Sequence, residues 1–166
     1  NGALANRAIK SVQIDNTRID KAGHKHFMAK EIAEQPGVIG AAIGHYLTPE
    51  GEINISAQDI DFTQFDRILM VACGTASYAC FTAKYWFEQI ARLPVEIDVA
   101  SEFRYREPPI PPRTLAVFVS QSGETADTLA ALRYCEGKAA RILSVVNVPE
   151  SSIARESDLA LPIYAG

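Results

Sequence analysis

The feature that most constrains this chain is a set of short apolar runs separated by segments with helical periodicity. Ile68–Ala72, Leu115–Val119 and Ile142–Val146 are each five residues long and contain at most one polar side chain. Runs of this length and composition are typical of strands that are buried on both faces of a parallel sheet. Such a sheet needs helices on both of its faces.

The remaining segments complete an alternation of strands and helices. Val95–Val99 alternates apolar and acidic residues as a strand does, and Leu159–Ile163 is a last short apolar run. Helices are expected at about Ser77–Ala91 and Thr125–Tyr134, where apolar residues recur at helical spacing. Strands that alternate with helices form parallel sheets through right-handed crossovers. The sequence therefore predicts the α/β fold class.

Three segments are expected along the chain: a polar linker or arm (1–20), a helical lead-in (21–66) and the sheet module (67–166). In the lead-in, a helix is predicted from about His24 to Gln35. Pro36-Gly37 is expected to interrupt it, because proline and glycine are the strongest local breakers. The chain has no initial Met and stops directly after the last strand, so we expect a fragment of a longer protein, with a truncated module.

Composition excludes several functional classes. The net charge of −4 argues against a nucleic-acid-binding surface, which needs a concentrated basic footprint. No apolar run approaches the ~20 residues of a membrane span, and the N-terminus lacks the apolar stretch of a signal peptide. Three cysteines (Cys73, Cys80 and Cys135) form no C-x-x-C pair and are odd in number. A reduced, cytoplasmic setting is therefore expected.

The most informative candidate site is the loop that follows the third strand, Ser120-Gln121-Ser122-Gly123-Glu124-Thr125. Ligands of open α/β sheets bind beyond the carboxyl ends of the strands, where helices begin. The hydroxyls of Ser120, Ser122 and Thr125 and the amide of Gln121 can donate to phosphate oxygens. Gly123 permits a tight turn, and the helix start adds unpaired N–H groups. Helix capping is the alternative, but capping requires only one hydroxyl.

A second loop, Cys73-Gly74-Thr75, follows the first strand and is weaker evidence when taken alone. It would close a ligand site from the other side. A dinucleotide site would require G-x-G-x-x-G here, and only Gly74 is present. The chain also lacks the G-K-[ST] of a P-loop. His24 and His26 are two residues apart and would diverge on a helix, so neither a metal nor another cofactor is expected.

Six motifs occur together along nearly the whole chain, from about Asp20 to Gly166. They are His26–Pro36, Ala72–Thr75, Lys84–Glu88, Ala100–Arg106, Ser120–Leu129 and Asn147–Pro149. In these residues and their order the chain resembles the glutamine–fructose-6-phosphate aminotransferases, also called glucosamine-6-phosphate synthases. The resemblance implies the first sugar isomerase (SIS) module of their isomerase domain. It also implies a three-layer, flavodoxin-like or Rossmann-like sandwich with a five-stranded parallel sheet.

The resemblance further implies a function and a set of site residues. These enzymes make glucosamine 6-phosphate and glutamate from fructose 6-phosphate and glutamine, at the start of amino-sugar biosynthesis. Ser120, Gln121, Ser122 and Thr125 would hold the sugar phosphate, and Cys73, Gly74 and Thr75 would lie near the sugar. The family often has Ser at the position of Ala76, so one phosphate hydroxyl is missing or comes from Ser77.

The same resemblance places the catalytic residues outside this chain. The glutaminase domain and the second SIS module, which carry the nucleophile, the isomerisation base and the reactive lysine, are absent. We therefore expect an inactive fragment that binds fructose 6-phosphate or glucosamine 6-phosphate and forms a homodimer. Phe103, Tyr105 and the helix bearing Trp86 are expected to form part of its exposed contact surface. Two alternatives stay open: a non-catalytic sugar-phosphate sensor of a regulator, and a generic Rossmann-type redox domain.

Overall fold

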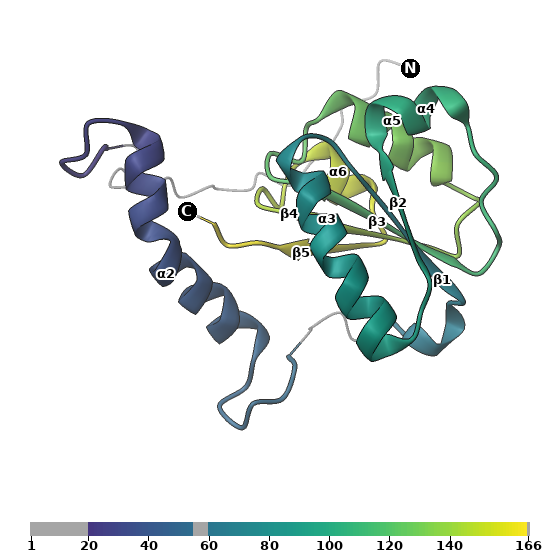
Figure 1. The fold of residues 1–166 in the computed structure, drawn as a ribbon, viewed down its shortest axis with the longest axis horizontal. Coiled ribbons are helices and arrows are strands. Elements are labelled where there is room, and N and C mark those ends of the chain that lie inside the picture. Colours follow the sequence, from purple (N-terminus) through teal and green to yellow (C-terminus); the bar gives the residue numbers. More distant parts are fainter. Residues whose placement is uncertain (1–19, 55–59, 166) are drawn as a thin grey trace, which may run out of the picture.

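The computed structural model describes residues 20–54 and 60–165, and its body is a five-stranded parallel sheet (Figure 1). The order across the sheet is β2-β1-β3-β4-β5, and every neighbouring pair is parallel. The strands are β1 (Arg67–Ala72), β2 (Val95–Val99), β3 (Thr114–Ser120), β4 (Arg141–Val146) and β5 (Leu159–Pro162). The predicted fold class and the five strands are confirmed.

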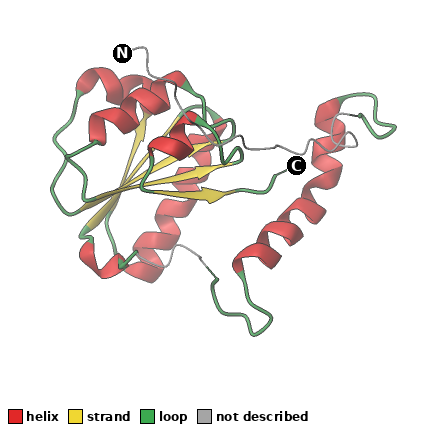
Figure 2. Cartoon of the chain, turned by 180° about the vertical axis from the view of Figure 1, so that it is seen from behind, coloured by secondary structure: helices red, strands yellow, loops and turns green. Residues whose placement is uncertain are grey.

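Helices cover both faces of this sheet, as Figure 2 shows from behind. One face carries α3 (Thr75–Trp86), which continues into a π-helical turn, η2 (Phe87–Ala91). The other face carries α4 (Ala100–Arg106), α5 (Ala126–Cys135) and α6 (Ser152–Glu156). This distribution follows from the strand order: the crossover from β1 to β2 runs in the opposite direction to the later ones, and right-handed crossovers then place its helix on the opposite face.

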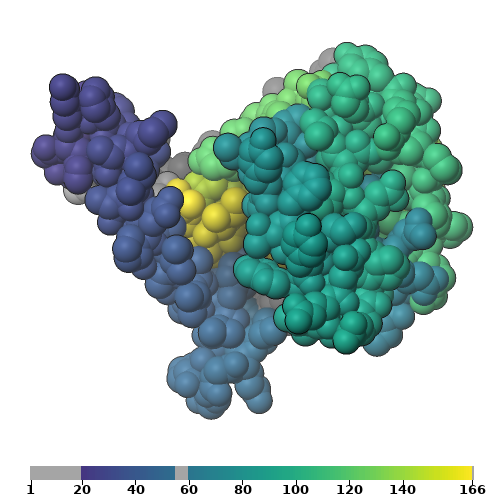
Figure 3. All heavy atoms as spheres, in the orientation of Figure 1, coloured from purple at the N-terminus to yellow at the C-terminus, as the bar shows by residue number. Residues whose placement is uncertain are grey.

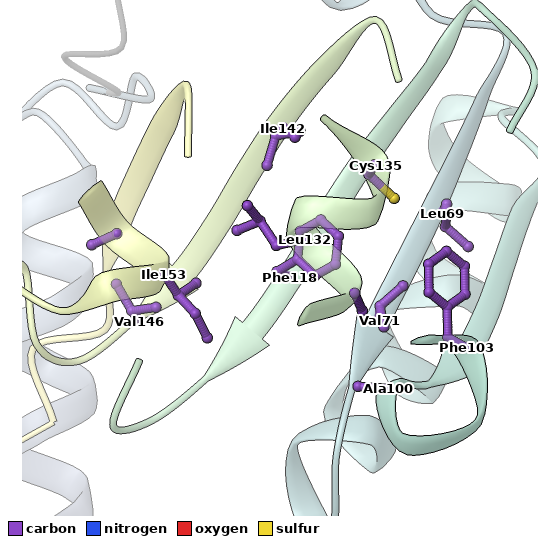
Figure 4. Packing of buried hydrophobic residues seen from close by; sticks show 13 residues of the cluster. Leu69, Val71, Ala100, Phe103, Phe118, Leu132, Cys135, Ile142, Val146 and Ile153 are labelled. Atoms are coloured by element: carbon purple, nitrogen blue, oxygen red, sulfur yellow. The ribbon is translucent and has the colours of Figure 1, made fainter. Parts of the chain in front are cut away.

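The larger hydrophobic core lies between the sheet and the three helices α4, α5 and α6. Phe118 and Leu132 form its centre and are completely buried (Figure 4). Phe103 is also completely buried and packs edge-on against Tyr134, with ring centroids 5.7 Å apart. Burying a side chain of this size contributes about 1.5–3 kcal/mol relative to leaving it exposed. This core therefore holds the sheet and the three helices as one unit.

The motif Ala100–Arg106 is a helix, α4, that is anchored in this core by Ala100 and Phe103. Its ion pairs reach other elements rather than running within the helix: Arg104 contacts Asp127 of α5 at 2.7 Å, and Arg106 contacts Asp98 of β2. The sequence suggested Phe103 as part of an exposed contact surface, and that suggestion is wrong. The 3.6-residue periodicity turns Phe103 towards the sheet and leaves Tyr105 exposed.

In the described part of the lead-in, the long helix α2 (Phe27–Tyr46) runs through Pro36 without interruption, and a short 3-10 turn, η1 (Phe62–Gln64), precedes β1. The predicted break at Pro36-Gly37 is therefore wrong. Proline in a helix interior removes one N–H donor and strains the preceding turn, but the helix survives where the freed carbonyl is satisfied. Nearly all of α2 is exposed, so water can hydrate the carbonyl that Pro36 leaves unpaired.

Helix α2 stands as a separate ridge beside the sheet, and the segment after β5 lies in the recess between them (Figure 3). The C-terminal end of α2 makes one hydrogen bond to the last residue of β5 and one to the segment after it. The Tyr46 hydroxyl donates to the carbonyl of Pro162 at 2.6 Å, and the Tyr164 hydroxyl lies 2.7 Å from Nε2 of His45. These contacts place α2 next to the β5 side of the sheet. The predicted linker or arm, 1–20, lies almost wholly outside the described residues.

The burial of the three thiols predicts different reactivities. Desolvation raises the pKa of Cys80 to about 11 and that of Cys135 to about 12, whereas Cys73 is only half-buried. The thiolate is the reactive species. At pH 8, a chromogenic disulfide reagent should therefore modify one thiol per native chain rapidly, and three after unfolding. Cys73→Ser should abolish the fast reaction and Cys80→Ser should not. Rapid modification of two thiols in the native chain would contradict this burial.

Candidate functional site

The candidate site lies at the carboxyl edge of the sheet, where the loops after β1, β3 and β4 meet. Ala72 and Val119 are register partners in the parallel pair β1–β3, so Cys73 and Ser120 leave the sheet at neighbouring positions. The two loops that the sequence singled out are therefore brought side by side. Parallel pairing produces this arrangement directly, because all carboxyl ends of parallel strands lie on one edge.

Ser120 organises the loop from within. It is the last residue of β3 and only 3% exposed. Its Oγ accepts a hydrogen bond from the backbone N–H of Gly123 at 3.1 Å and shares another with Thr125 Oγ1 at 3.1 Å. In this structure the Ser120 hydroxyl therefore ties the two ends of the turn together, a role that the sequence did not predict.

Gly123 lies where the loop packs closely on the start of α6. Its φ is +66°, a left-handed conformation that favours glycine. A Cβ at this position would lie 2.0 Å from Oγ of Ser151 and 2.4 Å from its Cβ. The carbonyl of Gly123 also accepts from the backbone N–H of Ile153 at 3.0 Å. The turn is thus held against α6 by shape as well as by hydrogen bonding.

Glu124 is directed away from the open side of the loop. Its carboxylate accepts a hydrogen bond from the backbone N–H of Ser152 at 2.7 Å. That hydrogen bond, more than any other contact, lowers the pKa of Glu124. Glu124 is therefore an anion bound to the first turn of α6, which does not suit it to act as a general base at neutral pH.

The groups that remain available to a ligand are the rest of the loop and the start of α5. Gln121 and Ser122 are exposed, and Thr125 is half-buried. Thr125 is the N-cap of α5 but its side chain makes no capping hydrogen bond, since its hydroxyl pairs with Ser120. The Thr125 hydroxyl therefore does not cap α5, contrary to the alternative interpretation of this loop. The first N–H groups of α5 are left to donate hydrogen bonds to an anion.

The second loop presents a more open surface. Gly74 and Thr75 are exposed and Cys73 is half-buried. Ser77, which could replace the hydroxyl missing at Ala76, donates to the carbonyl of Gly74 at 2.7 Å and is only 7% exposed. The Ser77 hydroxyl thus closes the first turn of α3.

One further residue, Asn147, contributes to the site and was not assigned a role from the sequence. The backbone N–H of Asn147 donates to the carbonyl of Gln121 at 3.0 Å. The Asn147 side chain makes two hydrogen bonds to the backbone of Ala165, at 2.7 and 3.0 Å. Asn147 therefore connects the loop after β3 to the segment after β5. Its position directly after a buried strand was the signal available in the sequence.

A cavity of about 470 Å³ opens between this loop and α2, in the recess visible in Figure 3. The sequence did not predict it, because nothing in a periodicity pattern says where an exposed helix lies. Its lining comes from α2, from the loop Ser120–Thr125 and from the segment after β5: Phe27, Lys30, Glu31, Glu34, Gln35, Val38, Gln121 and Ala165.

Residues 20–54 and 60–165 contain neither a metal-binding cluster nor a membrane-spanning helix. No group of three or more His, Cys, Asp or Glu side chains in these ranges is arranged to hold a metal ion. Within the same ranges, no helix is both long enough and apolar enough to cross a bilayer.

Comparison with known proteins identifies related chains. The sequence model of the SIS domain matches residues 61–166. Glutamine–fructose-6-phosphate aminotransferase [isomerizing] of Brucella abortus biovar 1 (strain 9-941) is 54% identical over 167 residues, an alignment that covers 100% of this chain and 28% of the relative. The chain therefore spans little more than a quarter of that curated relative.

Solved structures agree in fold. The C-terminal domain of glucosamine-fructose-6-phosphate aminotransferase from Francisella tularensis superposes with a TM-score of 0.83 at 43% identity, over 89% of this chain and 42% of that one. Glucosamine-6-phosphate deaminase from Thermotoga maritima superposes with a TM-score of 0.67 at 25% identity, over 83% of this chain and 40% of that one.

Replacing Gly123 should damage the loop more than replacing a comparable glycine elsewhere. Gly123→Ala combines a left-handed φ, which costs ~1–2 kcal/mol, with overpacking against Ser151, which costs ~1–3 kcal/mol. We expect a loss of about 2–5 kcal/mol in the free energy of unfolding, measured in urea. Gly137→Ala is the matched control, because its φ is +68° and a Cβ there meets nothing within 4 Å. Equal losses in the two variants would show that the contact with Ser151 has no energetic weight.

Proposed function

The chain belongs to the SIS domain family, and on that premise we propose that it is the fructose 6-phosphate-binding part of the isomerase domain of a glutamine–fructose-6-phosphate aminotransferase. The observation that carries the proposal is the loop Ser120–Thr125. It presents hydroxyl, amide and uncapped helix N–H groups at one point on the carboxyl edge of the sheet. The 54% identity to an aminotransferase of that name supports the choice of substrate.

The proposed binding mode places the phosphate over the N-terminus of α5. Ser122, Gln121 and Thr125 donate to its oxygens, together with the first N–H groups of the helix. The partial positive charge at a helix N-terminus stabilises the anion. Ser120 contributes by holding Thr125 and Gly123 in place. The loop Cys73–Thr75 borders the sugar from the β1 side.

The proposed activity of the whole protein is the conversion of fructose 6-phosphate and glutamine to glucosamine 6-phosphate and glutamate. In this proposal the chain binds and orients the sugar phosphate, and the glutaminase domain and a second SIS module supply the reacting groups. No cofactor or metal is assigned. Glu102, an exposed residue in the first turn of α4, and Glu124 are two carboxylates near this edge. Glu124 is occupied by its hydrogen bond to α6.

The proposal includes a homodimer located in the cytoplasm. The support for self-association is the outward side of α3 and of its continuation η2, where large apolar side chains stay exposed: Tyr78, Phe81, Tyr85, Trp86 and Ile90. Contiguous apolar surfaces of this kind usually mark an interface. The missing glutaminase domain, a second SIS module or a second copy of this chain are the candidate partners. Neither nucleic acid nor a membrane is proposed as a partner.

The alternative of a non-catalytic sugar-phosphate sensor is not favoured. The related chains reported above are named as enzymes, an aminotransferase and a deaminase. A Rossmann-type redox domain is not favoured either, because the loop after β1 contains a single glycine where a dinucleotide fingerprint has three.

The chain should bind hexose 6-phosphates and show no detectable binding of unphosphorylated hexoses. Hydrogen bonds to a charged group contribute roughly 1.5–3 kcal/mol each. Ser122→Ala and Thr125→Ala should therefore each weaken the binding of fructose 6-phosphate by about ten- to a hundredfold, measured by titration calorimetry. Ser157→Ala is the control. Ser157 lies at the C-terminal end of α6, away from the loop, and its hydroxyl donates to the carbonyl of Ile153. Equal affinities for fructose and fructose 6-phosphate would reject the proposal.

The chain alone should bind its ligand without converting it. Aldose–ketose isomerisation requires a base within hydrogen-bond reach of the transferred proton, and amination requires ammonia released by an activated nucleophile. Incubation with fructose 6-phosphate, with and without glutamine or ammonium, should yield neither glucose 6-phosphate nor glucosamine 6-phosphate above background. Product that disappears in Glu102→Gln would place a complete active site within this chain.

A further inference from the structure

The cavity between α2 and the phosphate loop has a charged lining that phosphate binding does not account for. Its volume of about 470 Å³ falls within the range of ~300–1,000 Å³ typical of small-molecule sites. Gln121 of the phosphate loop is part of its wall. A ligand whose phosphate occupies the loop is therefore adjacent to this cavity.

One face of α2 forms the opposite wall. Phe27, Glu31, Glu34 and Val38 follow one another at intervals of four, three and four residues, so they share one helical face. The two carboxylates occupy the middle of this face, and the apolar side chains lie at its two ends. The polar centre of this face thus carries two carboxylates, which accept hydrogen bonds and attract cations.

The charges of this wall do not cancel. Lys30 is 5% exposed, and its Nζ lies 3.6 Å from the carboxylate of Glu34, so these two groups form a pair within the wall. Glu31 is exposed and makes no ion pair with any residue of the described ranges 20–54 and 60–165. One carboxylate therefore remains available on the cavity side of α2.

The two walls differ in the chemistry that they accept. The loop Ser120–Thr125 offers donors for an anion, whereas Glu31 offers an acceptor for a cation or a hydroxyl. A ligand that satisfies both walls is anionic at one end and cationic at the other. A phosphate ester of an amino sugar has this distribution of charge, because its amine is protonated near neutral pH.

We infer that Glu31 is a specificity-determining residue, whose carboxylate receives the ammonium group of an amino-sugar phosphate held at the loop Ser120–Thr125. The inference rests on the proposed function, since it requires the phosphate to occupy that loop. One edge of the bound sugar faces Cys73–Thr75 and the other faces α2. The parent reaction consumes a sugar phosphate without an amine and produces an amino-sugar phosphate, so Glu31 favours the product.

Two ligands that differ in a single group test the assignment. Glucosamine 6-phosphate carries an ammonium group where glucose 6-phosphate carries a hydroxyl. Calorimetry on the 166-residue chain at pH 6.5 and low salt should give about tenfold tighter binding of glucosamine 6-phosphate, because a charge-assisted hydrogen bond is about twice as strong as a neutral one. In Glu31→Gln the two affinities should become equal, mainly through weaker binding of the amino sugar.

Glu31 is exposed, so its replacement should not affect folding, and a thermal melt of the variant verifies this. Glu136→Gln is the matched control, because Glu136 is an exposed glutamate at the far end of α5, away from the carboxyl edge. It should keep the tenfold preference. An unchanged preference in Glu31→Gln, or an equal loss for both ligands, would overturn the role of Glu31 while leaving the phosphate site intact. Failure of the wild-type chain to bind either ligand would instead refute the proposed function.

Discussion

The parallel pairing of β1 with β3 is the constraint on which the rest of the structure depends. Parallel strands cannot be joined by tight turns, so each connection has to cross a face of the sheet as a helix. The same pairing places the residues after both strands on one edge. Helices, core and candidate site are therefore consequences of a single choice of strand direction. The buried central strands support it with the apolar sequences that such pairing requires.

Much of this was predictable from the residues. Apolar runs of strand length identified β1, β3 and β4, and the hydroxyl-rich loop after β3 was placed correctly at the start of a helix. These features are local, because strand burial and helix starts are encoded within a few consecutive residues. The internal hydrogen bonds of Ser120 were not predictable, since the sequence shows that a hydroxyl is present but not which of several neighbours it contacts.

The predictions that failed concern contacts between distant segments. Pro36 was expected to end a helix, yet α2 continues because its exposed surface allows water to compensate for the lost hydrogen bond. Phe103 was expected at the surface, yet it is buried in the core, where it packs against Tyr134. The position of α2 opposite the loop Ser120–Thr125 depends on Tyr46 and His45, which contact residues more than a hundred positions away. No local pattern carries such information.

Asn147 gives this edge of the sheet a property that neither loop has alone. Through one side chain and one N–H group it joins the carbonyl of Gln121 to the backbone of Ala165. Ordering the loop Ser120–Thr125 therefore also orders part of the segment after β5, and the reverse holds as well. Thermodynamic linkage makes such coupling reciprocal: whatever immobilises one segment lowers the free-energy cost of immobilising the other. An anion at the loop and a chain segment packed beyond Ala165 would thus stabilise each other without touching.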